Sequence, residues 1–290
     1  MATIADLLSS SIMKNTFVMA GVMGWPVSHS RSPVIHNHWI RQYDLAGAYG
    51  LFAVEPSQLE TAIRGLKALG LAGCNITIPH KVDAMRYVDW VDPMAMRMGA
   101  INTIVVQADG ALHGFNNDGF GYQQSLREAQ PEWHANTGPV VILGAGGAAR
   151  AIVVSLLDAG ATEIRILNRT LNKAENLAQE FGQSVHALNW SERADALHGA
   201  ALLVNTTSLG MHGENALDIN LSQLPTSAIV SDIIYIPLET PLLAAARLRG
   251  NITVNGIGML LHQARPAFKA WFDVMPEVTP ELKNAIMATF

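Results

Sequence analysis

Short hydrophobic runs alternate with longer amphipathic stretches along most of the chain. Runs of this length are typical of buried strands, and their alternation with helical stretches is typical of α/β proteins. In the first part of the chain the pattern predicts strands at 17–23, 49–54, 73–76 and 101–106. In the second part it predicts strands at 140–143, 163–167, 201–205 and 228–232. We therefore expect two α/β regions in succession.

The predicted helices are marked by the residues that begin and end them. Ser32 followed by Pro33 is typical of a helix start, and Gly70 closes an amphipathic stretch at 56–69. A further helix at 119–130 leads into the second region. The tail from 256 to 290 is helical in pattern and rich in apolar residues.

Composition restricts the class of protein. A chain of 290 residues has room for two domains, and 49% hydrophobic with 15% charged residues is typical of a globular protein. The net charge of −5, without a basic cluster, argues against a nucleic-acid partner. The first 14 residues lack a signal-peptide pattern and no apolar run has the length of a membrane span. We therefore expect a cytoplasmic protein with no membrane partner.

Cysteine and histidine usage adds two expectations. The single cysteine, Cys74, excludes an intramolecular disulfide, fits a reducing compartment and is expected to be a small buried hydrophobe. The histidines His29, His36, His38 and His80 show no metal-ligand spacing, and a pair two residues apart points in different directions on a helix. We predict no metal site.

The stretch GAGGAAR at 144–150 follows the apolar run 140–143 and begins a helical pattern. Gly144 permits a tight strand-to-helix turn, Gly146 lets a pyrophosphate approach the backbone, and Ala149 lets the helix lie close to the sheet. Phosphates would bind the free N–H groups at the helix start. We expect cofactor contacts from Gly144, Ala145, Gly146, Gly147 and Ala148.

The end of the next predicted strand indicates which dinucleotide is bound. An NAD site usually carries Asp or Glu there, which binds the ribose 2′-hydroxyl and would repel a 2′-phosphate. This chain instead has Asn168, Arg169 and Thr170, with Lys173 one helical turn later. Lys173 alone is also consistent with a solvated helix start. We predict NADP as the cofactor, with NAD as a weaker alternative.

Polar residues follow the predicted strands of the first region, where open α/β sheets bind ligands. Ser28 and Ser30 stand beside a helix start and could hold a carboxylate. Asn75 and Thr77 alternate onto one side of the chain, and Lys81 follows them. Taken singly, each cluster is equally consistent with an ordinary turn.

Taken in order, these segments resemble the shikimate dehydrogenase family, and the resemblance extends from about residue 21 to 272. The segments are GWPVSHSRSP at 24–33, NITIPHK at 75–81, GAINT at 99–103, NNDG at 116–119, GAGGAAR at 144–150, NRT at 168–170, NTTSLGM at 205–211, DIIYIPLETP at 232–241 and GIGMLLHQ at 256–263.

The resemblance implies a fold and an activity. The fold would be an α/β substrate domain over 1–118, on which C-terminal helices at 256–290 pack back, and a Rossmann-type NADP-binding domain over 119–255. The activity would be reversible, NADP-dependent reduction of 3-dehydroshikimate to shikimate, with quinate or another ring acid as the alternative substrate. A monomer or homodimer is expected. A non-catalytic ligand-sensing protein is the alternative outside the enzymes.

The resemblance also implies residue roles. Ser28 and Ser30 would bind the substrate carboxylate, and Lys81 and Asp118 would form the catalytic pair. The ring hydroxyls would be held by Asn75, Thr77, Asn102, Asp118, Tyr235 and Gln263. Further cofactor contacts would come from Thr206, Ser208, Ile233, Gly256 and Met259. For Met259, packing in the core is an equal alternative.

Lys81 bears on the proton transfer, and Asn117 bears on the choice of substrate. Hydride transfer at a carbinol carbon requires a general acid–base group that reaches the oxygen, and Lys81 suits this role if partial burial lowers its pKa; a solvated surface lysine is the alternative. Asn117 stands where the family has threonine, next to Asp118. This departure leaves the choice between shikimate and quinate open.

Overall fold

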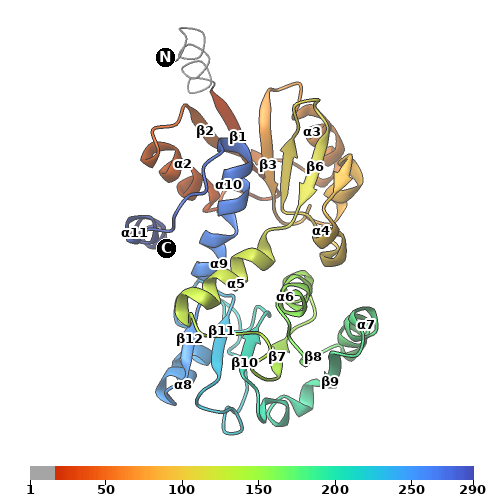
Figure 1. Cartoon of the computed structure of the whole chain (residues 1–290), viewed down its shortest axis with the longest axis vertical. Coiled ribbons are helices and arrows are strands. Elements are labelled where there is room, and N and C mark those ends of the chain that lie inside the picture. The colour runs from red at the N-terminus through yellow and green to blue at the C-terminus, as the bar shows by residue number, and fades with distance from the viewer. Residues whose placement is uncertain (1–16) are drawn as a thin grey trace, which may run out of the picture. The chain divides into compact units, whose positions relative to one another are not determined.

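The computed structural model describes residues 17–290, which form two compact units. Residues 1–16, which include the stretch assessed for a signal peptide, lie outside this range. The first unit contains the chain up to Asn117 together with Ala264–Phe290, and the second spans Asp118–Gln263. Each has one sheet of six strands with packed helices, which confirms the predicted two-domain α/β fold (Figure 1). Within residues 17–290 no helix is long and apolar enough to cross a membrane.

The sheet of the first unit is mixed and has the strand order β2-β1-β3-β5-β6-β4. β1 pairs in parallel with β2 and β3, β5 is antiparallel to β3 and β6, and β4 is parallel to β6. The strands are β1 Val18–Gly24, β2 Gly47–Ala53, β3 Leu71–Ile76, β4 Trp90–Val91, β5 Thr103–Val106 and β6 Leu112–Phe115. The helices are α2 Ser32–Gln42, α3 Leu59–Gly65, α4 Pro93–Met98, α10 Ala264–Phe272 and α11 Pro280–Met287, with 3₁₀ helices η1 Pro56–Gln58 and η2 Asp83–Tyr87.

Successive residues of β3 point to opposite faces of this sheet. Cys74 and Ile76 enter a hydrophobic cluster with Ile63 of α3. Asn75 lies on the other face, where it meets Tyr49 of β2. Cys74 is fully buried, as expected for a small core residue, and this burial raises the pKa of its thiol.

Gly73 lets α10 approach the same strand closely. A Cβ at this position would lie 2.1 Å from the Ile104 carbonyl oxygen and 2.2 Å from Trp271 Nε1. The Trp271 indole instead donates a hydrogen bond of 3.2 Å to that carbonyl. A residue far along the sequence is thus fixed to the first sheet.

The sheet of the second unit is entirely parallel, with the order β12-β11-β10-β7-β8-β9. This is the doubly wound order of dinucleotide-binding domains, with its switch point between β7 and β10. The strands are β7 Val140–Leu143, β8 Ile164–Asn168, β9 Val185–Asn189, β10 Leu202–Asn205, β11 Ile229–Asp232 and β12 Ile252–Val254. The helices are α5 Asp118–Ala129, α6 Gly147–Asp158, α7 Leu171–Phe181, α8 Pro241–Leu248 and α9 Gly256–His262, with 3₁₀ helices η3 Trp190–Glu192 and η4 Asp195–Leu197.

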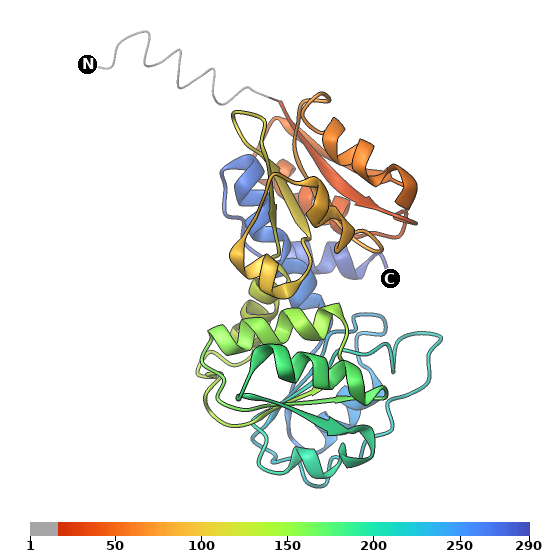
Figure 2. The same ribbon diagram turned by 90° about the vertical axis from the view of Figure 1, so that its right-hand side faces the viewer.

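The side chains of the central strand β7 pack in two hydrophobic cores. Val140 and Ile142 pack in a cluster with residues of α5, α6 and α7, whereas Val141 and Leu143 pack in a second cluster with residues of α8. Figure 2 shows α6 and α7 on the same face of the strands. A strand buried on both faces reads as a continuous apolar run, which is why the sequence indicates it clearly.

The observed units divide the chain differently from the expected boundaries. Helix α9 packs against α5, and His262 Nε2 lies 3.0 Å from Glu128 Oε2. The tail therefore joins the first unit at Ala264 rather than at residue 256, and Asp118 begins α5 in the second unit. The helix predicted over 56–69 is instead η1 followed by α3, which ends at Gly65, four residues earlier than expected. The pattern gave no indication of β4, β6, β9 or β12, each of which has five residues or fewer.

Candidate functional site

The second unit carries a cavity at the switch point of its sheet. Its volume is about 240 Å³, and it lies where β7, β8 and β10 end. Its lining residues are Gly144, Ala145, Gly146, Asn168, Arg169, Lys173, Trp190, Thr206, Thr207, Ser208 and Leu209. The structure thus brings together eight of the residues predicted to bind the cofactor.

The glycine turn forms one wall of this cavity. Gly144 has a φ of +107°, and a Cβ there would lie 2.5 Å from Thr206 Oγ1, so only glycine suits this position. A Cβ at Gly146 or Gly147 would meet no atom of the described residues within 4 Å, which leaves open space above the start of α6. Gly146 is the N-cap of α6 and has no side chain with which to cap the first N–H groups. These groups are suited to bind phosphate.

The end of β8 supplies positive charge. Arg169 and Lys173 are both exposed, and neither forms an ion pair with another residue of the described range. Asn168 Nδ2 donates to the Thr170 carbonyl at 2.8 Å, so this amide shapes the turn before α7. Two cations without a neighbouring carboxylate fit a 2′-phosphate better than a 2′-hydroxyl.

The opposite wall is built from the motif at 205–211. Asn205 Oδ1 accepts from the Thr207 N–H at 3.0 Å and from Thr207 Oγ1 at 2.7 Å. Asn205 Nδ2 donates to Asp232 Oδ1 at 3.1 Å, and Thr240 Oγ1 donates to Asp232 Oδ2 at 2.7 Å. Burial raises the pKa of Asp232, opposed by its hydrogen bonds from Thr240, Ile234 and Asn205. These buried groups shape the loop that holds Thr206 and Ser208.

The sequence did not predict three residues of the cavity, and the structure places six of the predicted contacts outside its lining. Trp190, Thr207 and Leu209 were missed; Trp190 follows β9, and without that strand nothing in the sequence pointed to it. The predicted contacts outside the lining are Gly147, Ala148, Thr170, Ile233, Gly256 and Met259. Ile233 and Met259 pack against the core, in line with the packing alternative for the methionine. A Cβ on Gly256 would lie 2.0 Å from the Ile233 carbonyl oxygen, so this glycine permits a close approach of two backbones.

In the first unit, buried amides and hydroxyls form a hydrogen-bonded network. Asn75 Nδ2 donates to the Asn102 carbonyl and to Thr103 Oγ1, both at 3.0 Å, and Asn75 Oδ1 accepts from the Tyr49 hydroxyl at 2.6 Å. Thr103 Oγ1 donates to Asn102 Oδ1 at 3.0 Å. Asn75, Asn102 and Thr103 are each less than a tenth exposed. Because both amide hydrogens of Asn75 are used, this side chain offers a ligand one remaining acceptor position.

Asn117, the departure from the family pattern, belongs to the same network. Its Nδ2 donates to Thr103 Oγ1 and its backbone N–H donates to Asn102 Oδ1, each at 3.0 Å. No local sequence pattern indicates Tyr49 or Thr103, because their contribution depends on strand register. β3 lies between β1 and β5, which places Asn75 opposite Thr103.

The segment between β1 and α2 forms a tight turn around the two serines. The Ser30 N–H donates to the Val27 carbonyl at 3.0 Å, and Ser30 Oγ accepts from the Ser32 N–H at 3.3 Å. Because Ser30 Oγ is the acceptor in that bond, its own hydrogen is not used there. Ser28 is exposed. Hydroxyl donors beside a helix start suit a carboxylate.

The remaining predicted residues lie in defined backbone positions. Thr77 and Lys81 follow β3; the Thr77 N–H donates to the Met23 carbonyl, and the Lys81 carbonyl accepts from the Ile101 N–H, both at 2.9 Å. Lys81 is half-buried.

His80 is buried, and its Nε2 lies 2.7 Å from the Val54 carbonyl oxygen, so it joins two loops. Asp118, Tyr235 and Gln263 belong to the second unit. Within residues 17–290 no cluster of three His, Cys, Asp or Glu is arranged to hold a metal.

Comparisons with known proteins agree across both units. A family described as the shikimate dehydrogenase substrate binding domain matches residues 22–104, and a family described as shikimate / quinate 5-dehydrogenase matches residues 127–234. The chain is 52% identical over 270 residues to shikimate dehydrogenase (NADP(+)) from Paramagnetospirillum magneticum, covering 93% of this chain and 98% of that protein.

Solved structures give the same picture. Shikimate 5-dehydrogenase from Thermus thermophilus in complex with NADP(H) and shikimate superimposes with a TM-score of 0.83 at 32% identity, covering 94% of this chain and 100% of that one. Quinate dehydrogenase from Corynebacterium glutamicum in complex with NAD gives 0.86 at 27% identity, with the same coverage of 94% and 100%.

Proposed function

We propose, because the chain belongs to the shikimate dehydrogenase family, that it catalyses the reversible NADP-dependent reduction of 3-dehydroshikimate to shikimate. The observation that carries the proposal is the cavity of the second unit, where a glycine turn faces two cations in place of a carboxylate. The relative at 52% identity carries NADP(+) in its name, which supports the same cofactor.

The residues of this cavity fit NADP. The N–H groups at the start of α6 and the open space above Gly146 would hold the pyrophosphate, and Arg169 and Lys173 would hold the 2′-phosphate. When bound, the cofactor supplies or accepts the hydride. NAD remains the weaker alternative, since it lacks the phosphate that the two cations would bind.

The first unit offers the groups for a hydroxylated ring acid. Ser28 and Ser30 would bind the carboxylate, while Asn75, Thr77 and Asn102 would hold ring hydroxyls, as the resemblance implies. The network supports this role because it fixes the hydrogen-bonding direction of Asn75. We assign Tyr235 and Gln263 of the second unit to the same task.

The proton transfer is assigned to Lys81 and Asp118. As hydride adds to the carbonyl carbon, the Lys81 ammonium would donate a proton to the oxygen, and the reverse direction would return it. Asp118 would orient both the lysine and the substrate hydroxyl. A ligand-sensing protein would have no use for such a pair.

Steady-state kinetics with purified protein test the proposal directly. Shikimate and quinate would each be supplied with NADP⁺ or NAD⁺, and the rise of the reduced-cofactor absorbance would be followed. We expect the highest kcat/KM for shikimate with NADP⁺. No turnover with either acid would exclude the enzyme and favour the ligand-sensing alternative, and a higher kcat/KM for quinate would reassign the substrate.

Three further expectations stay predictions. We propose that the protein acts as a monomer or homodimer, in the cytoplasm and without a nucleic-acid partner. Light scattering of the purified chain would determine the first. The acidic net charge of −5 supports the last, because phosphate-rich polymers bind cationic surfaces.

A further inference from the structure

Arg31, which separates Ser30 from Ser32, connects the serine turn to the far end of the chain. Its Nη1 donates to the His29 carbonyl at 3.0 Å and its Nη2 donates to the Thr289 carbonyl at 2.7 Å. Its guanidinium carbon lies 5.6 Å from the centre of the Phe290 ring. The Arg31 side chain therefore bridges two segments of the first unit that are 258 residues apart.

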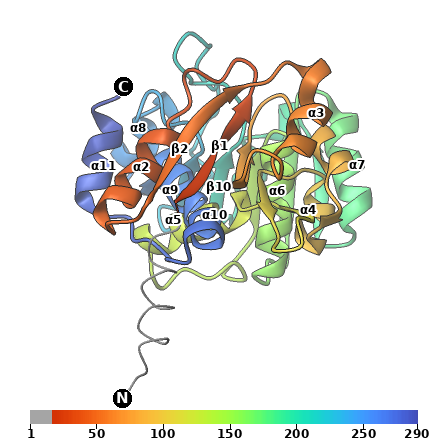
Figure 3. The same cartoon turned by 90° about the horizontal axis from the view of Figure 1, so that it is seen from above.

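A second connection joins the same helix to Glu277. Trp39 Nε1 of α2 donates to the Glu277 carbonyl at 2.9 Å, and the Glu277 N–H donates to the Tyr43 hydroxyl at 3.2 Å. Between the two connections α11 runs beside α2 (Figures 1 and 3). We call residues 277–290 the brace, because they contact α2 near both of its ends.

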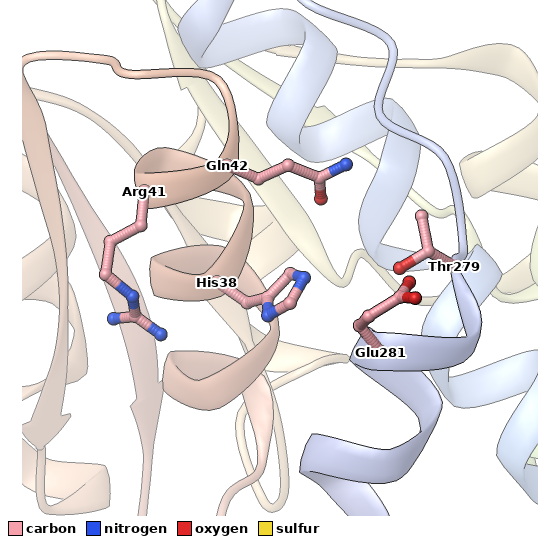
Figure 4. A pocket seen from close by; sticks show the side chains of 5 residues that line it. All are labelled: His38, Arg41, Gln42, Thr279 and Glu281. Carbon is pink, nitrogen blue, oxygen red and sulfur yellow. The ribbon is translucent and has the colours of Figure 1, made fainter.

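The two helices do not close on each other along their whole length. A groove of about 400 Å³ opens between them, and Figure 4 shows His38 facing Glu281 across it. The groove is lined by His38, Arg41, Gln42, Thr279 and Glu281. The hydrogen bonds at Glu277 and at Arg31 lie on either side of this groove.

The direction of the guanidinium identifies its task. Arg31 points its hydrogen bonds at two backbone carbonyls rather than at the serine hydroxyls, and its Nε is buried without a hydrogen-bond partner among the described residues. Burial of a cation edge is unfavourable, so the carbonyls and the Phe290 ring must offset it. Meanwhile the Arg31 carbonyl accepts the Val34 N–H at 3.0 Å in the first turn of α2.

We propose that Arg31, held by Thr289 and Phe290 of the brace, is a positioning residue that sets the serine turn for the substrate carboxylate. The inference rests on the proposed role of Ser28 and Ser30. A turn held at both ends has its hydroxyls already in place, so binding of the acid does not lose the free energy of ordering them. Loss of the brace contact should thus weaken binding of the carboxylate and leave the hydride and proton steps unchanged.

The test compares Arg31→Met, Arg31→Lys and Phe290→Ala with the unchanged protein. The substrates are shikimate and its methyl ester, which lacks the carboxylate charge. We expect Arg31→Met to raise KM for shikimate about tenfold, as for loss of a charge-assisted hydrogen bond, with kcat and the KM for NADP⁺ nearly unchanged. Phe290→Ala should raise it in the same direction by a smaller factor. Arg31→Lys should recover only part of the loss, because one ammonium cannot bond both carbonyls.

A matched control and a second measurement separate the possible failures. Arg41→Ala removes an exposed arginine of the same helix and should leave every constant unchanged. Equal changes in KM for the acid and the ester, an unchanged KM in Arg31→Met, or full recovery in Arg31→Lys would each overturn the proposal. If the unchanged protein turned over neither shikimate nor quinate, the proposed function would fail. Hydrogen exchange of the backbone amides would still test the brace. Faster exchange at 28–32 in Phe290→Ala supports it, and unchanged exchange rejects it.

Discussion

The two units hold their candidate ligand groups in opposite ways. In the second unit the groups are backbone N–H donors at a glycine turn and exposed cations, each of which stands by itself. In the first unit Asn75, Asn102 and Thr103 are buried, and each of these side chains is hydrogen-bonded to another residue of the network. Changes at independent groups should add, whereas changes within a network should not. The two sets of candidate residues can thus differ in how they respond to substitution.

The largest effect is expected where the first unit contributes chemistry as well as binding. Lys81→Met should lower kcat by about a hundredfold or more, because the general acid–base group is lost, while KM for shikimate changes little. Steady-state kinetics in both directions measure this. Lys67→Met, which removes a surface lysine bonded to the Asp109 carbonyl, is the control and should retain full activity. Near-normal kcat in the Lys81 variant would remove that residue from proton transfer.

The next effect tests whether an exposed cation of the second unit acts on the 2′-phosphate alone. Arg169→Ala should cost about 1.5–3 kcal/mol in NADP binding, as expected for a charge-assisted contact, and almost nothing in NAD binding. Titration calorimetry with both cofactors measures the difference. Arg127→Ala, at the end of α5, removes a comparable exposed charge and should change neither affinity. Equal losses for the two cofactors would refute the assignment of Arg169 to the 2′-phosphate.

The third effect is a pH dependence of the stability, which we expect from the buried His36 in the core of the first unit. His36 stacks on Tyr49 with ring centres 4.1 Å apart, and burial lowers its pKa from 6.5 to about 3. Between these values the unfolded chain binds the proton and the folded chain does not, so stability falls as the pH falls. The loss from this residue should reach about 2 kcal/mol at pH 5. Urea denaturation of the unchanged protein and of His36→Phe should show it, and an identical pH slope in both would contradict it.

The smallest effect tests the coupling inside the network. Asn117→Thr restores the family residue but removes the amide that donates to Thr103 Oγ1. We expect KM for shikimate to rise about fivefold, which corresponds to one net hydrogen bond of about 1 kcal/mol. The combination with Tyr49→Phe should be non-additive, because Tyr49 bonds Asn75, Asn117 bonds Thr103, and Asn75 donates to Thr103. Simple addition of the two effects would show that the network does not transmit them.

The same contrast explains what the sequence could indicate. The nucleotide site depends on a strand, a turn and a helix in direct succession, so Gly144 and Arg169 were predicted from local pattern and lie in one cavity. The network depends on the pairing of β3 with β5, whose register places Cys74 opposite Ile104 and Asn75 opposite Thr103. Periodicity does not give register between strands that are distant in sequence, and therefore Tyr49 and Thr103 were missed.

The unit boundary was harder to predict for a related reason. The apolar pattern of 256–290 indicates helices but not the surface on which each one packs. Helix α9 contacts α5, while α10 reaches the first sheet through the space left by Gly73. A close approach of this kind depends on one glycine whose partner lies nearly two hundred positions later, and no local signal marks it.

Cys74 gives the first unit a built-in reporter. It is the single cysteine of the chain, it is fully buried beside Ile63 and Ile76, and the second unit has none. A thiol reagent can therefore label the protein only while the first unit is open, and the labelling rate would measure that opening without interference from the nucleotide domain. Opening of the first unit could then be followed by itself during unfolding, with no mutation introduced to make it visible.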